Sequence, residues 1–163
     1  MSDKHDRLIN LEISFSLKIY SNMPIINGTY KLKTNENLTS VLAAQGLGMV
    51  ARNMANSMNQ TFTYTYDEAA KTIEQVMVAK EEKKNTYIID GPEVEKEAAG
   101  GRGILMDSVK LSDKGFILTR REKTGLYTAE NEFVFEEGKM TILLKTTTKD
   151  GKVVEGKRFF EKV

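Results

Sequence analysis

The fold is decided by the stretch NLTSVLAAQGLGMVARNMANSM, residues 37–58. Its apolar side chains recur with a helical period, which predicts helices over residues 37–45 and 49–58 joined by Gly46-Leu47-Gly48. A strand-like segment, residues 28–33, comes shortly before it. Because a helical pair that follows the first strand of a β chain cannot join the sheet, we expect it to form a lid over the interior of a barrel. The stretch therefore indicates a protein that encloses a ligand.

Each predicted helix has an apolar face. In the first, Leu38, Val41 and Leu42 share one side. The side-chain oxygen of Asn37 is placed to cap the first turn of this helix. We expect the apolar face of the second helix to be the inner surface of the lid; it consists of Met49, Val50, Met54 and Met58.

The rest of the chain has the pattern of a β meander. Asp150-Gly151 is the sharpest turn signal and predicts a two-residue hairpin turn. A meander this long leaves exposed edges unless it closes, so we expect an all-β barrel of antiparallel strands. The glycines that mark its turns lie ten to thirteen residues apart, and they are Gly115, Gly125, Gly138 and Gly151.

Composition restricts the function. The chain has 163 residues, which suits one domain, and a formal net charge of only +1, which gives no reason to expect nucleic acid or more than transient membrane contact. It has no cysteine, so disulfides and cysteine-ligated metals are excluded. The one histidine is His5, which leaves no Ser-His-Asp triad and no multi-histidine metal site. We expect no catalytic residue, no metal and no cofactor.

Two further segments have simple explanations. The charged runs at residues 80–84 and 93–97 mix acids and bases, as solvated faces do. The glycine-rich segment at residues 99–103 lacks the Lys-Ser/Thr ending and the following helix of a phosphate-binding loop. We expect it to be a loop between strands.

The first 22 residues stand apart from the rest of the chain. Charged side chains interrupt their apolar positions, whereas a secretory signal has an uninterrupted apolar stretch. We expect residues 1–22 to be a flexible extension and residues 23–163 to be the folded domain. Without a signal or disulfides, an extracellular protein is disfavoured, and we expect a cytoplasmic monomer.

Arg158 is the first candidate for a binding residue. Two-residue alternation along the last strand places it on the same face as Gly156 and Phe160, while Glu155 and Lys157 occupy the other face. The apolar face is expected to turn inward and to carry Arg158 with it, although a solvent-exposed arginine at a strand edge fits the pattern equally well. A guanidinium inside a barrel needs water, an internal carboxylate or an anionic ligand as partner.

Arg120 is the second candidate. It lies in phase with Phe116 and Leu118, while Arg121 lies in phase with Ile117 and Thr119. Both faces are half apolar, so alternation alone does not choose between the two arginines.

Several short motifs resemble, in their order and spacing, the intracellular lipid-binding proteins, which are the fatty-acid-binding protein family. The resemblance extends along nearly all of residues 24–163. Its motifs are Gly28-Thr29-Tyr30-Lys31-Leu32, Asn35-Glu36-Asn37-Leu38, Leu47-Gly48, Ala51-Arg52-Asn53-Met54-Ala55-Asn56, Asp90-Gly91-Pro92-Glu93-Val94-Glu95 and Lys157-Arg158-Phe159-Phe160-Glu161-Lys162.

The resemblance implies a ten-stranded antiparallel up-and-down β-barrel, lipocalin-like and capped by a helix-turn-helix lid. It implies a non-enzymatic carrier that holds a long-chain fatty acid or a retinoid in a water-filled cavity, with the ligand carboxylate on Arg158 beside Phe160. It favours Arg120 over Arg121 as a polar cavity residue. Further ligand contacts are expected from the lid and the wall, namely from Leu38, Val41, Leu42, Leu47, Ala55 and Ile142.

The chain departs from the family pattern at three places. Leu38 and Thr39 follow Asn37 where the family usually has phenylalanine and an acidic residue. Phe160 stands where the family usually has tyrosine, and no arginine lies on the strand around residues 133–135. Carboxylate binding is therefore expected to depend on Arg158, with Arg120 in support. A carrier of a retinoid or another ligand with a neutral headgroup is an alternative, as is a membrane-apposed structural barrel that holds lipid incidentally.

Overall fold

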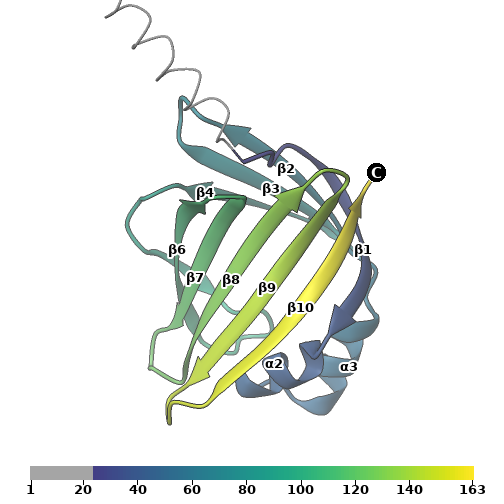
Figure 1. Ribbon diagram of the computed structural model, residues 1–163. Helices are drawn as coiled ribbons and strands as arrows, with labels where there is room; N and C mark the ends of the chain where they lie inside the picture. Colours follow the sequence, from purple (N-terminus) through teal and green to yellow (C-terminus); the bar gives the residue numbers. More distant parts are fainter. Residues whose placement is uncertain (1–23) are drawn as a thin grey trace, which may run out of the picture.

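The computed structural model describes residues 24–163, so the expectations for residues 1–22 lie outside the described residues. The order of elements confirms the predicted one: a first strand, two helices and then a long series of strands (Figure 1). The elements are β1 (Gly28–Glu36), α2 (Leu38–Ala44), α3 (Met49–Ser57), β2 (Thr61–Asp67), β3 (Thr72–Val78), β4 (Glu82–Ile88), β5 (Val94–Glu97), β6 (Ile104–Ser112), β7 (Gly115–Glu122), β8 (Tyr127–Glu136), β9 (Lys139–Thr148) and β10 (Val153–Lys162).

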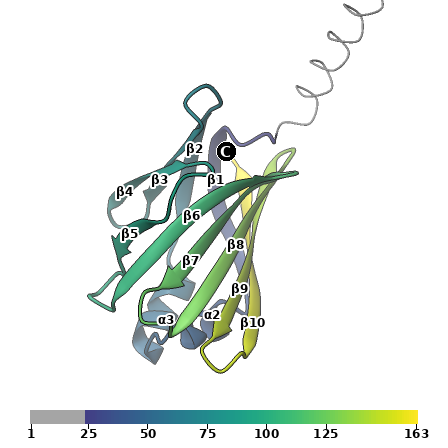
Figure 2. The same cartoon turned by 90° about the vertical axis from the view of Figure 1, so that its left-hand side faces the viewer.

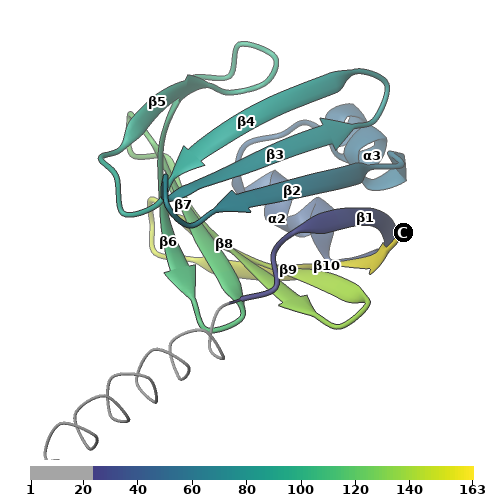
Figure 3. The same cartoon turned by 90° about the horizontal axis from the view of Figure 1, so that it is seen from above.

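The strands form one ten-stranded antiparallel sheet that curls into a barrel. Its order is β4-β3-β2-β1-β10-β9-β8-β7-β6-β5, so strands that follow one another in sequence pair throughout except at β4 and β5, and β10 returns to pair with β1 (Figure 3). This confirms the predicted up-and-down topology. Strands β4 and β5 are the two ends of the sheet and are not hydrogen-bonded to each other. We call the place where they meet the seam; an isolated bridge between Ile89 and Val109 lies beside it.

One end of the barrel interior is filled by aromatic rings. Phe116 and Phe133 stack with their centroids 4.3 Å apart, and Tyr64 meets Phe135 edge-on at 5.3 Å. These side chains and Tyr30 are buried, and together they form what we call the aromatic floor. Such ring pairs add to the stabilisation that comes from buried apolar area. The aromatic floor therefore closes the end of the barrel that is remote from the helices.

The two helices cover the other end, as Figure 2 shows. Helix α2 packs on β9 and β10, and it buries Leu38 and Val41 in the core. Gly156 of β10 allows this contact, because a Cβ there would lie 2.8 Å from the Glu36 carbonyl oxygen and 3.0 Å from Val41. The predicted lid is thus confirmed as a helix-turn-helix. Within residues 24–163, neither helix has the length and apolar character needed to cross a bilayer.

The prediction that the side chain of Asn37 caps α2 is wrong. Asn37 has left-handed backbone angles, and its side chain makes no capping hydrogen bond. Its amide nitrogen instead donates to the Glu155 carbonyl oxygen of β10 at 2.7 Å. The side chain therefore ties the start of the lid to the barrel wall.

The prediction of a two-residue hairpin at Asp150-Gly151 is also wrong. Thr148 donates its backbone N–H to the Lys152 carbonyl oxygen, so this closing hydrogen bond encloses a turn of three residues, 149–151. Of the three, only Gly151 has a positive φ, of 86°.

Gly115 begins β7 and is needed for space, since a Cβ there would lie 1.9 Å from the Phe133 carbonyl oxygen.

The apolar face of α3 does not point inward, contrary to the prediction. Met49, Val50 and Met54 are more than half exposed, and α3 buries no residue. Helix α3 packs on α2 rather than on the barrel wall, so its apolar residues are left at the surface.

The segment at residues 99–103 is a loop between β5 and β6, as predicted.

Candidate ligand-binding site

Arg158 projects from β10 into the barrel. Its Nε donates to Asn35 Oδ1 at 2.9 Å, and its Nη2 donates to Gln60 Oε1 at 2.6 Å. Its Cζ lies 5.5 Å from the centroid of the Phe160 ring. Both hydrogen-bond acceptors are neutral amides. Among the described residues, no carboxylate forms an ion pair with this guanidinium.

The environment of Arg158 disfavours its charge. Burial lowers the pKa of Arg158 to about 10, and the electrostatic interaction with Tyr64 partly opposes this shift. The guanidinium still holds a positive charge at neutral pH, but it does so without a counter-charge. Because arginine has five N–H donors, several remain available for an anion after the two amides are satisfied.

Arg120 also faces inward, but it is already neutralised. It projects from β7 in phase with Phe116 and Leu118. Its Nε and Nη2 donate to the two oxygens of Asp107 at 2.9 and 2.8 Å, and Asp107 is only 3% exposed. Burial alone would lower the pKa of Arg120, but the hydrogen bonds and charge of Asp107 raise it above its usual value.

Arg121 points the other way. Its Nη2 pairs with Glu93 at 2.8 Å on the outer surface, where both side chains are about half exposed. The structure therefore resolves the choice that alternation left open, since Arg120 is the inward arginine of the two.

A row of polar side chains crosses the inner wall on β2, β3 and β4. Tyr64, Gln75 and Asn85 are direct cross-strand partners on β2, β3 and β4. Gln75 donates to the Tyr64 hydroxyl at 3.0 Å, while its own oxygen accepts from Asn85 at 3.2 Å and from the Tyr87 hydroxyl at 3.3 Å. We call Tyr64, Gln75 and Asn85 the polar row.

Lys96 of β5 continues the polar row across the seam. Its Nζ donates to Asn85 Oδ1 at 2.8 Å and lies 4.9 Å from the centroid of the Tyr87 ring. Sequence reasoning missed this residue, because the charged run at residues 93–97 was expected to be solvated throughout. Lys96 faces inward because it pairs with Leu105, whose side chain is buried.

The remaining predicted ligand contacts lie near the lid and on the wall. Ile142 is buried and pairs directly with Arg158 across β9 and β10. Phe160 is also buried, two residues further along β10. In the lid, Leu38 and Val41 are buried, whereas Leu42, Leu47 and Ala55 are half-buried.

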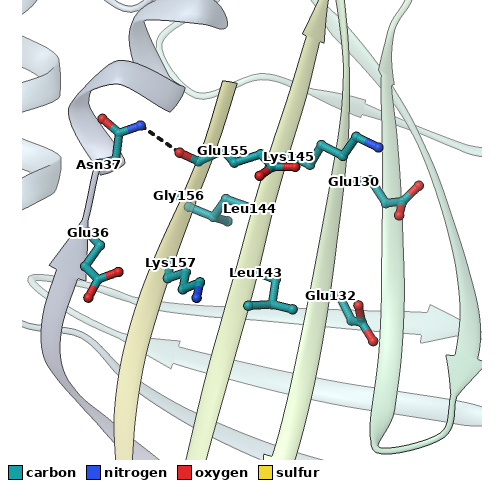
Figure 4. Close-up of a pocket in the computed structure, with 10 residues that line it drawn as sticks. All are labelled: Glu36, Asn37, Glu130, Glu132, Leu143, Leu144, Lys145, Glu155, Gly156 and Lys157. Carbon is teal, nitrogen blue, oxygen red and sulfur yellow. Dashed lines mark hydrogen bonds between the residues drawn. The ribbon is translucent and has the colours of Figure 1, made fainter. Parts of the chain in front are cut away.

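Three hollows lie on the outside of the barrel and around the lid. The one in Figure 4, of about 380 Å³, is lined by outward charges of β8, β9 and β10 such as Glu130, Lys145 and Lys157. A second, of about 790 Å³, lies between the helices and the β9–β10 turn. The third, of about 290 Å³, lies between α3 and the β3–β4 turn, beside Met54 and Lys80. Neither Arg158 nor Arg120 is among the described residues that line these three hollows.

Comparison with known proteins gives a match in fold. No protein-family model matches the sequence, and no curated protein sequence matches it. Solved structures match closely. The fatty acid binding protein of Schistosoma mansoni in complex with arachidonic acid superposes with a TM-score of 0.71 at 17% identity, covering 87% of this chain and 98% of that one.

Two more structures show the same likeness. Apo lipid binding protein 8 of Caenorhabditis elegans gives a TM-score of 0.70 at 19% identity, covering 84% of this chain and 94% of that one. The REP1-NXSQ fatty acid transporter gives a TM-score of 0.66 at 22% identity, and the match covers 84% of this chain and 95% of that one. The chain thus has the fold of the fatty-acid-binding proteins, as its motifs led us to expect.

Proposed function

We propose that this protein is a non-enzymatic carrier that binds a long-chain fatty acid, or a similar anionic lipid, inside the barrel. The observation that carries the proposal is Arg158, an inward guanidinium that two neutral amides hold without a counter-charge. A ligand carboxylate supplies the missing charge. The fatty acid binding protein and the fatty acid transporter that share the fold bear names that agree with this proposal.

The surroundings of Arg158 suit a headgroup. Asn35 and Gln60 hold it through their side-chain oxygens, and both are only partly buried. The aromatic floor lies on the opposite side of Arg158. A carboxylate that reaches the guanidinium forms charge-assisted hydrogen bonds in a poorly solvated place, where such bonds are strongest.

The tail of the ligand would be bound by apolar burial. We assign its contacts to Ile142 on the wall, to Phe160, and to the lid residues Leu38, Val41, Leu42, Leu47 and Ala55. Burial of the chain contributes about 25 cal/mol for each Å² of apolar surface removed from water. Entry requires movement of the lid, because two helices this short are not stable without their packing.

Arg120 has a secondary role in this proposal. Its bidentate pair with Asp107 already satisfies the guanidinium, so Arg158 is the primary carboxylate ligand. We further propose a cytoplasmic monomer, on the basis of a cysteine-free chain and the family resemblance.

The test compares Arg158→Gln with the unmodified protein for binding of hexadecanoic acid and hexadecanol. Loss of charge-assisted bonds should weaken acid binding about ten- to hundredfold and change alcohol binding by less than about threefold. Arg121→Gln, which removes an outward arginine, is the matched control. Equal losses for acid and alcohol would favour a carrier of neutral-headgroup ligands. Cosedimentation of lipid-free protein with bilayers would favour the membrane-apposed structural role.

A further inference from the structure

Lys96 is a second inward cation without an acidic partner. In residues 24–163 no carboxylate lies within ion-pair distance of its Nζ. Asp107 is the acid whose charge acts on Lys96, and both oxygens of that carboxylate accept hydrogen bonds from Arg120. Glu95, its neighbour in sequence, faces outward and pairs with Lys123. Lys96 therefore has no ion-pair partner among the described residues.

The environment of Lys96 is that of a binding group rather than of a surface lysine. Burial lowers its pKa, and the charge of Asp107 only partly opposes this. One N–H is used by Asn85, and an ammonium group has three. The ammonium group lies beside the Tyr87 ring at the seam, and its remaining N–H groups are free to bind an anion.

Arg158 and Lys96 stand on opposite walls. In the closed order of strands, β5 is five strands from β10 in either direction around the barrel. The polar row extends from Lys96 across β4, β3 and β2 along one of these routes. Asn85, at one end of the row, accepts a hydrogen bond from Lys96, and Tyr64, at the other end, lies on β2, two strands from Arg158 on β10.

We propose that Lys96 is a second ligand-binding residue, and that the barrel takes an amphiphile with an acidic group at each end of its chain, as in a long-chain dicarboxylic acid. This inference rests on the proposed function, because it places the first carboxylate at Arg158. The second carboxylate pairs with Lys96 at the seam. A monocarboxylic acid would leave one of the two cations without a partner, and a dicarboxylic acid satisfies both.

The experiment measures binding of hexadecanoic acid and hexadecanedioic acid to the full chain and to its variants. Lys96→Gln should weaken binding of the diacid about tenfold or more and leave binding of the monoacid within about twofold. Lys96→Arg should retain diacid binding, because it keeps the charge. Lys110→Gln, at an exposed position on β6, is the matched control and should change neither.

Asn85→Ala separates ligand binding from closure of the seam. It removes the hydrogen bond across the seam and keeps the charge of Lys96, so diacid affinity should persist. An equal loss of diacid affinity in Asn85→Ala and Lys96→Gln would overturn the inference, as would a Lys96→Gln variant that binds both acids unchanged. If either of these results is found while monoacid binding still depends on Arg158, the inference about Lys96 fails and the proposed function stands. If the unmodified protein binds neither acid, both the inference and the proposed function fail.

Discussion

Asn35 lies directly opposite Arg158 because the first strand contains a β-bulge. The pairing of β1 with β10 shifts between Leu32 and Thr34, so Asn35 faces inward where simple alternation would have placed Thr34. The bulge thus gives Arg158 a neutral acceptor on its Nε. Bulges commonly redirect a side chain beside a functional site. This one helps to keep the guanidinium oriented and uncompensated.

Asn35→Asp tests whether the missing counter-charge is what makes the site a receptor for anions. The new carboxylate would stand about where the Asn35 oxygen accepts from Arg158, and would compete with any ligand carboxylate. We expect hexadecanoic acid to bind about tenfold more weakly, with thermal stability unchanged or raised. Displacement of a fluorescent fatty acid measures the affinity. Unaltered acid binding by a folded Asn35→Asp variant would show that the headgroup lies elsewhere.

Local pattern was sufficient to predict most of the fold. The spacing of glycines predicted the meander, and the 3.6-residue period predicted both helices, because turns and amphipathic helices depend on neighbouring residues. The direction of the α3 apolar face was wrong for a physical reason. An apolar face buries itself only if a partner lies next to it, and α3 packs on α2 instead of on the barrel.

The binding residues were predictable only in part. Arg158 was a candidate because Gly156 and Phe160 share its face within one strand. Its partners Asn35 and Gln60 come from segments about a hundred residues away, and the bulge that turns Asn35 inward breaks the two-residue period. Lys96 faces inward because of the register between β5 and β6, which local charge patterns do not encode.

The Asp107–Arg120 pair should matter for stability more than for ligand binding. Asp107→Leu leaves a largely buried guanidinium without its counter-charge and should lower the free energy of unfolding by about 3 kcal/mol. We expect the lower end of the usual range, because 29% of the Arg120 side chain is exposed. Urea unfolding measures the loss. The double variant with Arg120→Met should recover much of it, and strictly additive losses would argue against the pairing.

Glu122 should make the protein sensitive to acid. Its carboxylate accepts hydrogen bonds from the Thr124 hydroxyl and from the backbone N–H groups of Thr124 and Leu126. These bonds, the Thr124 hydroxyl first, lower the pKa of Glu122 below its ordinary value of 4.5. A lowered carboxyl pKa gives stability that is present above pH 4.5 and is lost as the pH falls through the folded-state pKa.

Glu122→Gln should therefore be less stable than the unmodified protein at pH 7, and the gap in melting temperature should narrow as the pH falls below about 4.5. Thermal unfolding between pH 3 and pH 7 measures this gap. Glu130→Gln, which alters an exposed carboxylate, is the control. A gap that stays constant across this range would mean that Glu122 acts through packing rather than through its charge.

Gly156 should control how firmly the lid closes. An added Cβ would lie 2.8 Å from the Glu36 carbonyl oxygen and 3.0 Å from Val41 Cγ2, so Gly156→Ala must push α2 away from β10. We expect a loss of about 1–3 kcal/mol in the free energy of unfolding, which is typical of overpacking. Amide hydrogen exchange should accelerate in α2, and a bound fatty acid should dissociate faster because the lid opens more readily. Gly48→Ala is the matched control, since a Cβ there meets nothing within 4 Å. Faster exchange in α2 with unchanged dissociation would show that the ligand does not leave past this helix.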